Sequence, residues 1–208
     1  MLYIITNRKL CRKPLEQVIH EAVIAGAEAV ILREKDLPPR KLYELAERIK
    51  PITQKNGVPL IINRSIEVAL AVKAEGVHLG HDAIPIEIAR GVIPHKMVVG
   101  ASVHSVKEAE EAEAKGADYL LAGHVFKTSS KPGMGSRGVT FIKSIRDRVS
   151  IPVVAIGGID EHTLDFLVKK GISDVAVMSA VMEAQNVFAK VKKISDRLKG
   201  KAWLKGGQ

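Results

Sequence analysis

One histidine lies deep in an apolar segment of this chain, and its position suggests acid–base chemistry. His124 stands near the carboxyl-terminal end of the run LLAGHVF. An imidazole changes charge near neutral pH, so it can accept one proton and return one. The alternative is a hydrogen-bonded core histidine. His78, in a similar run, is interpreted as structural, and His20, His95 and His162 are interpreted as surface residues.

Two cations suggest that the protein binds an anion. Arg33 and Lys35 flank Glu34, so both can face the same side of the chain. A pair of cations can hold a carboxylate or a diphosphate, and arginine can do so with two parallel hydrogen bonds. Ion pairs with Glu34, Asp36 or another acid are the alternative.

Two glycines suggest a second anion site. Gly157 and Gly158 end the run PVVAIGG, and without a Cβ they let an anion approach the backbone closely. Ser179 and Ala180 follow the run DVAVM, ahead of a predicted short helix. Backbone N–H groups at these four positions predict phosphate binding. A tight turn is the alternative.

A long polar segment follows His124. Residues 127–138, KTSSKPGMGSRG, are rich in glycine and predict a lid or a binding loop. Thr128 stands at its beginning, and Lys131 and Arg137 are placed to reach an anion when the loop closes. A simple connecting loop is the alternative.

The elements that would position these residues repeat along the chain. Short β-branched and apolar runs, each bounded by Gly, Pro, Asn or Asp, predict buried parallel strands. These runs are Leu2–Thr6, Ala29–Arg33, Pro59–Asn63, Gly76–Gly80, Met97–Ser102, Tyr119–Phe126, Pro152–Gly158 and Asp174–Ser179. Helical periodicity between them predicts helices over Leu15–Ala25, Arg40–Lys55, Val106–Lys115, Thr163–Lys170 and Val187–Leu198.

Eight runs in 208 residues give one strand per 26 residues. That repeat is typical of a (β/α)8 TIM barrel, predicted here as one domain over residues 1–208 with a basic tail at about 199–208. An open doubly wound sheet would need a glycine-rich turn after the first strand, and ITNRKL has none. In a barrel, the active site lies where the strands end. The strand ends add Asn63, Arg64, His81, Ser102 and His104 to the candidates.

Composition excludes several classes of protein. With 46% hydrophobic and 26% charged residues the chain is not disordered, and charged residues interrupt every apolar run before the ~20 residues that span a bilayer. Most of the net charge of +9 comes from basic residues at position 190 and beyond. The aromatic residues, 4% of the chain, do not alternate with basic ones, which argues against nucleic-acid binding. The single cysteine, Cys11, and the absence of a signal-peptide pattern predict a cytoplasmic protein.

Seven segments resemble, in order, those of the thiamine-phosphate-synthase superfamily, a family of (β/α)8 barrels. The segments are ILREKD, IIN, EVALAVKAEGVHLG, GASVHS, GADYLLAGHVFKTSSK, IPVVAIGGI and VAVMSAV. The synthases of this family join a pyrimidine diphosphate to a thiazole phosphate, and they hold magnesium with the motifs IND and GQED. This chain has Arg64 at the Asp of IND and Ala83 at the Asp of GQED. A magnesium site needs carboxylates, so the resemblance to a synthase is incomplete.

Without those carboxylates the chain resembles the thiazole tautomerases of the same family, also in GHVFKTSSKPGMGSRGVTFI. The resemblance implies aromatisation of a carboxythiazole phosphate by proton transfer at His124, with no metal or organic cofactor, in a homodimer. Arg33, Lys35 or Arg64 would face the carboxylate. The implied substrate-binding residues are Arg33, Lys35, Asn63, Ser102, Thr128, Lys131, Gly157, Gly158, Ser179 and Ala180. A thiamine phosphate synthase and a non-enzymatic regulatory ligand-binding protein are the alternatives.

Overall fold

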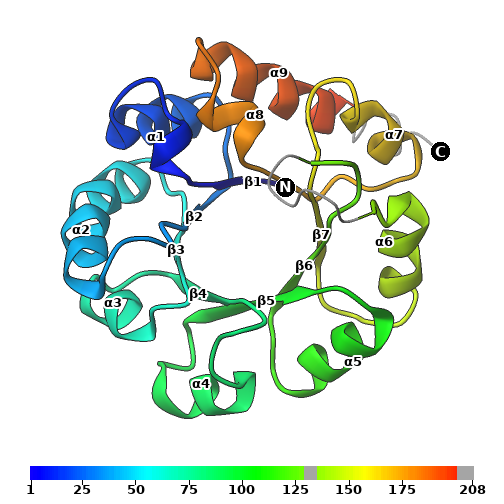
Figure 1. The fold of residues 1–208 in the computed structure, drawn as a ribbon, viewed down its shortest axis with the longest axis horizontal. Helices are drawn as coiled ribbons and strands as arrows, with labels where there is room; N and C mark the ends of the chain where they lie inside the picture. The colour runs from blue at the N-terminus through cyan, green and yellow to red at the C-terminus, as the bar shows by residue number, and fades with distance from the viewer. Residues whose placement is uncertain (129–134, 201–208) are drawn as a thin grey trace.

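The computed structural model describes residues 1–128 and 135–200, which form a closed barrel of parallel strands inside a ring of helices (Figure 1). The strands stand around the barrel in sequence order. They are β1 (Leu2–Ile5), β2 (Ala29–Leu32), β3 (Leu60–Asn63), β4 (Gly76–Leu79), β5 (Val98–Val103), β6 (Tyr119–Gly123), β7 (Val153–Ile156) and β8 (Val175–Val177). The predicted (β/α)8 TIM barrel, a single domain, is confirmed.

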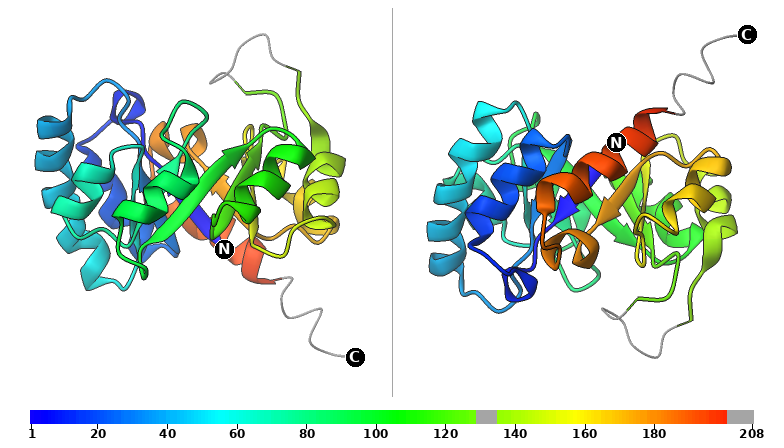
Figure 2. Two further views of the ribbon diagram at one scale, coloured as in Figure 1. Left: turned by 90° about the horizontal axis from the view of Figure 1, so that it is seen from below. Right: turned by 90° about the horizontal axis from the view of Figure 1, so that it is seen from above.

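Helices connect the strands and cover the outside of the barrel (Figures 1 and 2). They are η1 (Arg8–Leu10, a 3-10 helix), α1 (Leu15–Ile24), α2 (Pro39–Lys55), α3 (Ile66–Ala71), α4 (Ile86–Val92), α5 (Val106–Ala114), α6 (Gly138–Arg146), α7 (Leu164–Lys169), α8 (Ser179–Met182) and α9 (Val187–Gly200). Within the described residues, no helix is both long and apolar enough to cross a membrane.

Pairing of the first strand with the last closes the sheet and excludes the open doubly wound alternative. Tyr3 of β1 stands beside Ala29 of β2 on one side and Ala176 of β8 on the other. Every neighbouring pair runs parallel. The carboxyl ends of the strands therefore meet at one mouth of the barrel.

Side chains alternate between the inside and the outside of the barrel, as the two-residue period of a strand requires. In β2, Ile31 belongs to the cluster that fills the interior, while Val30 and Leu32 pack in the larger cluster between the sheet and the helices. The interior cluster is Tyr3, Ile5, Ala29, Ile31, Ile61, Tyr119, Leu121, Val154 and Ala176.

A glycine makes room for one of the two tyrosines in the barrel interior. Tyr119 of β6 stacks on Tyr3 with ring centroids 5.5 Å apart. A Cβ added at Gly100 of β5 would lie 2.1 Å from Tyr119 Cζ. No larger residue fits at position 100 unless the tyrosine ring moves.

Three details differ from the sequence-based expectations. The pattern missed α3, α4 and α6. The equally short α5 and α7 were predicted, because each is followed by a glycine, Gly116 or Gly171, that marks the end of a helix, and the missed helices have no such signal. Strand β6 ends at Gly123, so His124 follows the strand rather than lying within it. The polar segment predicted over 127–138 ends earlier, because Gly138 begins α6. Residues 129–134 of that segment and 201–208 of the basic tail lie outside the described residues.

We expect Gly100→Ala to destabilise the barrel by about 3 kcal/mol, because the added methyl group overlaps the Tyr119 ring in a packed interior. Gly91→Ala is the matched control. Gly91 lies in α4 with no atom within 4 Å of an added Cβ. Alanine there should raise the free energy of unfolding by at most about 1 kcal/mol. Urea denaturation measures both free energies of unfolding. Equal stabilities for the two variants would contradict this packing argument.

Candidate active site

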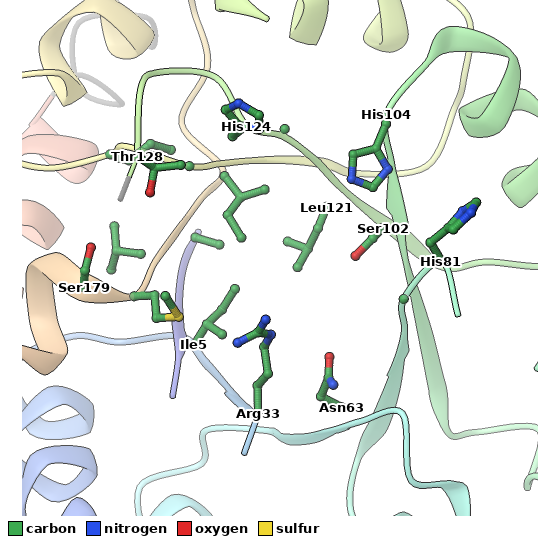
Figure 3. Close-up of a pocket in the computed structure, with 18 of the residues that line it drawn as sticks. Ile5, Arg33, Asn63, His81, Ser102, His104, Leu121, His124, Thr128 and Ser179 are labelled. Atoms are coloured by element: carbon green, nitrogen blue, oxygen red, sulfur yellow. The ribbon is translucent and has the colours of Figure 1, made fainter. Parts of the chain in front are cut away.

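A cavity of about 470 Å³ opens at the carboxyl-terminal mouth of the barrel. Its floor is apolar and includes Ile5, Leu121 and Ile156 from the strands. Figure 3 shows Arg33 and Asn63 on one side of the cavity and His124 and Thr128 on the other. The cavity therefore combines an apolar base with a polar rim drawn from strands that are distant in sequence.

The structure brings together most of the residues predicted from strand ends. Those that line the cavity are Arg33, Lys35, Asn63, Ser102, His124, Thr128, Gly157, Gly158 and Ser179. Ala180 lines a neighbouring hollow instead, beside Glu183 and Lys190. Lys131 lies outside the described residues.

Glu34 is turned away from its cationic neighbours in the sequence. Its buried carboxylate accepts hydrogen bonds from the Thr6 hydroxyl at 2.6 Å and from Arg8 Nη1 at 3.0 Å. Asp36 pairs with Arg8 and Lys9. The ion pairs that were the alternative for Arg33 and Lys35 are therefore made by other cations.

Arg33 is half-buried in the cavity wall. Burial lowers the pKa of its guanidinium; the charge of Glu34 opposes this, and the positive charge of Arg64 adds to it. Among residues 1–128 and 135–200, no carboxylate forms an ion pair with Arg33 or Lys35. These two cations are thus available to an anion that enters the cavity.

Arg64 follows β3 and takes a backbone conformation that is rare for a residue with a side chain. Its φ is 69°, a region that favours glycine and costs other residues about 1 kcal/mol or more. The Arg64 N–H donates to the carbonyl oxygen of His78 at 2.9 Å. Arg64 Nη1 lies 2.9 Å from Asp82 Oδ2 in an exposed ion pair at the rim of the cavity.

His78 holds Ser102 at the cavity wall. Its Nδ1 lies 3.1 Å from the Tyr119 hydroxyl, and its Nε2 lies 2.9 Å from Ser102 Oγ. Burial, with a smaller contribution from the charge of Arg33, lowers the pKa of His78 to about 3. The imidazole is therefore neutral at physiological pH, with one ring nitrogen as donor and the other as acceptor. The structural interpretation of His78 agrees with this network.

The two glycines that follow β7 are required by packing against the segment after β6. Gly157 and Gly158 have φ angles of 99° and 65°. A Cβ on Gly157 would lie 2.3 Å from the Cβ of His124, and one on Gly158 would lie 2.4 Å from the carbonyl oxygen of Lys127. His124 is consequently wedged beside β7 with only 4% of its surface exposed.

Several residues line the cavity in addition to the predicted substrate-binding residues. His81, Asp82 and His104 stand at its rim, and Met178 at its floor. The strand-end rule named His81 and His104 as candidates, but nothing in their spacing distinguished them. Asp82 falls where the GQED motif of the synthases has its Glu, but its pairing with Arg64 gave no sequence signal because Arg64 follows a different strand.

The residues at the cavity do not fit a magnesium site built from carboxylates. Among the described residues, no group of three or more His, Cys, Asp or Glu side chains is placed to hold a metal ion. Asp82 already pairs with Arg64. Ala83 packs against the core and lines a separate shallow hollow. Magnesium requires oxygen ligands, usually including carboxylates.

Comparison with known proteins identifies related sequences and structures. One protein family, described as Thiamine monophosphate synthase, matches residues 2–181. A thiamine-phosphate synthase of Pyrococcus horikoshii is 45% identical over 89% of this chain and 88% of its own, and one of Clostridium tetani is 38% identical over 96% and 94%. The solved structure of a thiamine phosphate pyrophosphorylase from Pyrococcus furiosus has a TM-score of 0.88 at 39% identity, covering 96% and 95% of the two chains.

These relatives correct the predicted activity. The prediction of a thiazole tautomerase is wrong, since relatives at 38–45% identity over most of the chain are named thiamine-phosphate synthase. The prediction relied on Arg64 and Ala83 at the metal-ligand positions. Those residues bear on how negative charge is neutralised in the cavity, and they say nothing about which bond is made there.

The buried neutral His78 predicts a specific dependence of stability on pH. Between pH 6.5, the usual pKa of histidine, and about 3, the unfolded chain binds a proton at this residue that the folded chain does not. The free energy of unfolding should therefore fall on acidification through this window, by up to about 1.4 kcal/mol per pH unit from His78 alone. Urea denaturation at pH 7, 6 and 5 measures the slope.

His78→Gln should flatten that slope, because glutamine has no proton to gain. His162→Gln is the control, since His162 has a side chain 84% exposed and should leave the slope unchanged. If the His78→Gln protein keeps the wild-type slope, the acid sensitivity comes from other groups.

Proposed function

This chain belongs to the thiamine monophosphate synthase family, and from that premise we propose that it is a transferase that makes thiamine phosphate. Its substrates would be a pyrimidine that carries a diphosphate and a thiazole that carries a phosphate. The names of the relatives at 38–45% identity support this proposal. A cytoplasmic location and a homodimer stay predictions from the sequence.

The proposed reaction exchanges one bond for another. The lone pair of the thiazole nitrogen forms a bond to the methylene carbon of the pyrimidine, and the bond from that carbon to the diphosphate oxygen breaks. The diphosphate leaves with the electron pair. No proton is gained or lost at the attacking nitrogen, so the reaction needs charge neutralisation and alignment rather than a general base.

One observation carries the proposal: the cavity presents two faces suited to two phosphorylated substrates. Arg33 and Lys35, which lack carboxylate partners in the described residues, lie at the end of β2 on one face. Gly157, Gly158 and Ser179 lie at the ends of β7 and β8 on the other, where barrels often bind phosphate. The apolar floor between them suits two aromatic rings.

We assign the diphosphate to the first face and the thiazole phosphate to the second. Arg33 and Lys35 would bind the diphosphate, with Asn63 beside them. Backbone N–H groups of Gly157, Gly158, Ser179 and Ala180 would bind the phosphate. Thr128 stands near that face, and Lys131 joins it in this proposal from the sequence alone.

Two side chains between the faces would align the rings. His124, wedged against Gly157, would form one wall, and Ser102, held by His78, would form another. In this reaction His124 would position the rings by van der Waals contact and by hydrogen bonding, as a wall of the cavity. The proton transfer predicted for it belonged to the tautomerase reaction and is not part of the proposal.

We expect the purified protein to form thiamine phosphate from the two substrates, and Arg33→Met to lower kcat/KM by about 10- to 100-fold. The loss follows from removing charge-assisted hydrogen bonds of about 1.5–3 kcal/mol. Arg40→Met, on the exposed surface of α2, should keep the wild-type rate. Product is measured chromatographically, with and without magnesium. Failure of the wild type to form product under every condition would refute the proposal.

We expect Ser179→Asp to weaken binding of the thiazole phosphate at least tenfold, because it places a carboxylate against the phosphate. The corresponding thiazole alcohol should lose less than about threefold. Position 179 is preferred to Gly158, where any Cβ would meet the backbone of Lys127. Titration calorimetry with both ligands makes the comparison, and equal losses for the two would place the phosphate elsewhere.

A further inference from the structure

The cavity wall carries more positive than negative charge. Arg33, Lys35 and Arg64 line it, and Asp82 is the single carboxylate among the lining residues that the structure describes. Arg33 is also partly withdrawn from water, which strengthens its interaction with any anion in the cavity. A divalent cation would meet three positive side chains here, whereas a diphosphate would meet three complementary charges.

The carboxylate of Asp82 is poorly placed to hold a metal. It lies 2.9 Å from Arg64 Nη1, so a cation bound to this carboxylate would stand beside the positive charge of that guanidinium. The neighbouring Ala83 supplies only a methyl group, which packs against the core. The chemistry of this rim therefore favours an anion over magnesium.

Arg64 brings a positive charge to the rim at the position where the IND motif of the synthases has an aspartate. Its ion pair with Asp82 is exposed, with side-chain exposures of 40% and 63%, and such pairs contribute little net stability. An incoming anion can therefore displace Asp82 at small cost. Arg64 also has a φ of 69°, a conformation that costs a residue with a side chain, and strained residues of this kind are found often at binding sites.

We infer that Arg64 exchanges Asp82 for the diphosphate of the substrate and, together with Arg33, neutralises it without a metal ion. Both guanidinium groups can bind phosphate oxygens through two parallel hydrogen bonds. The identity of the substrate rests on the proposed function, but the metal-free binding of a diphosphate is tested separately from it.

The first test is titration calorimetry of the full chain with inorganic diphosphate, in EDTA and in magnesium chloride. The wild type should bind in EDTA, and magnesium should not tighten the binding. Arg64→Gln should weaken binding in EDTA by about 10- to 100-fold. Arg40→Gln is the control, since Arg40 is 89% exposed and pairs with Glu44 on its own helix, and it should bind as the wild type does. Binding by the wild type only when magnesium is present, or wild-type affinity in Arg64→Gln, overturns the inference.

The second test restores carboxylates with the double variant Arg64→Asp/Ala83→Asp. It should lose at least 100-fold in affinity for diphosphate in EDTA, and magnesium should recover part of that loss. Circular dichroism confirms that the barrel is intact. Retention of wild-type affinity in EDTA by the folded double variant would show that Arg64 does not contact the anion.

Product formation separates this inference from the proposed function. Synthesis of thiamine phosphate in EDTA supports both. If diphosphate binds in EDTA but no product forms under any condition, the proposed function fails and the metal-free site stands. If both binding and synthesis require magnesium, the function stands and the inference fails.

Discussion

Closure of the sheet is the constraint on which the rest of this protein depends. Because β1 pairs with β8, the carboxyl ends of all strands form one ring, and side chains from distant parts of the chain face a common cavity. The interior below that cavity is filled by the cluster around Tyr119. Gly100 leaves the space that its ring needs. The packed interior thus supports both the barrel and the floor of the site.

The positive charge of the cavity depends on which residues bind the two acids near β2, Glu34 and Asp36. Glu34 bonds to Thr6 and Arg8, and it thereby ties the loop after β1 to the end of β2. This arrangement neutralises the one carboxylate that stands between Arg33 and Lys35 in the sequence. Among the described residues no carboxylate pairs with these two cations, and the one carboxylate that lines the cavity, Asp82, pairs with Arg64. Such an environment is suited to phosphorylated ligands.

The family and the altered rim lead to a consistent view of the chemistry. Transfer of a pyrimidine from diphosphate to a thiazole nitrogen needs the leaving charge to be neutralised, whether by a metal ion or by guanidinium groups. In the proposed function, Arg64 and Ala83 at the carboxylate positions would change how the leaving charge is neutralised and would leave the bond that is made the same. Residues at metal-ligand positions were therefore a poor guide to the reaction itself, while similarity over most of the chain identified the family.

The sequence by itself determined the barrel, the approximate strand ranges and most of the residues at the cavity, because buried parallel strands are continuous apolar runs and their ends are polar. The helix α3 was missed, although α7 of the same length was predicted, because a glycine marks the end of α7 and none follows α3. Only the tertiary structure decided which cations pair. Arg8 meets Glu34 across 26 positions, and His78 meets Ser102 across 24. Arg64 and Asp82 likewise follow different strands. The two-residue alternation placed Arg33 and Lys35 on one side of their strand. It could not say which residue of another strand or loop lies opposite them, because that depends on the register between strands.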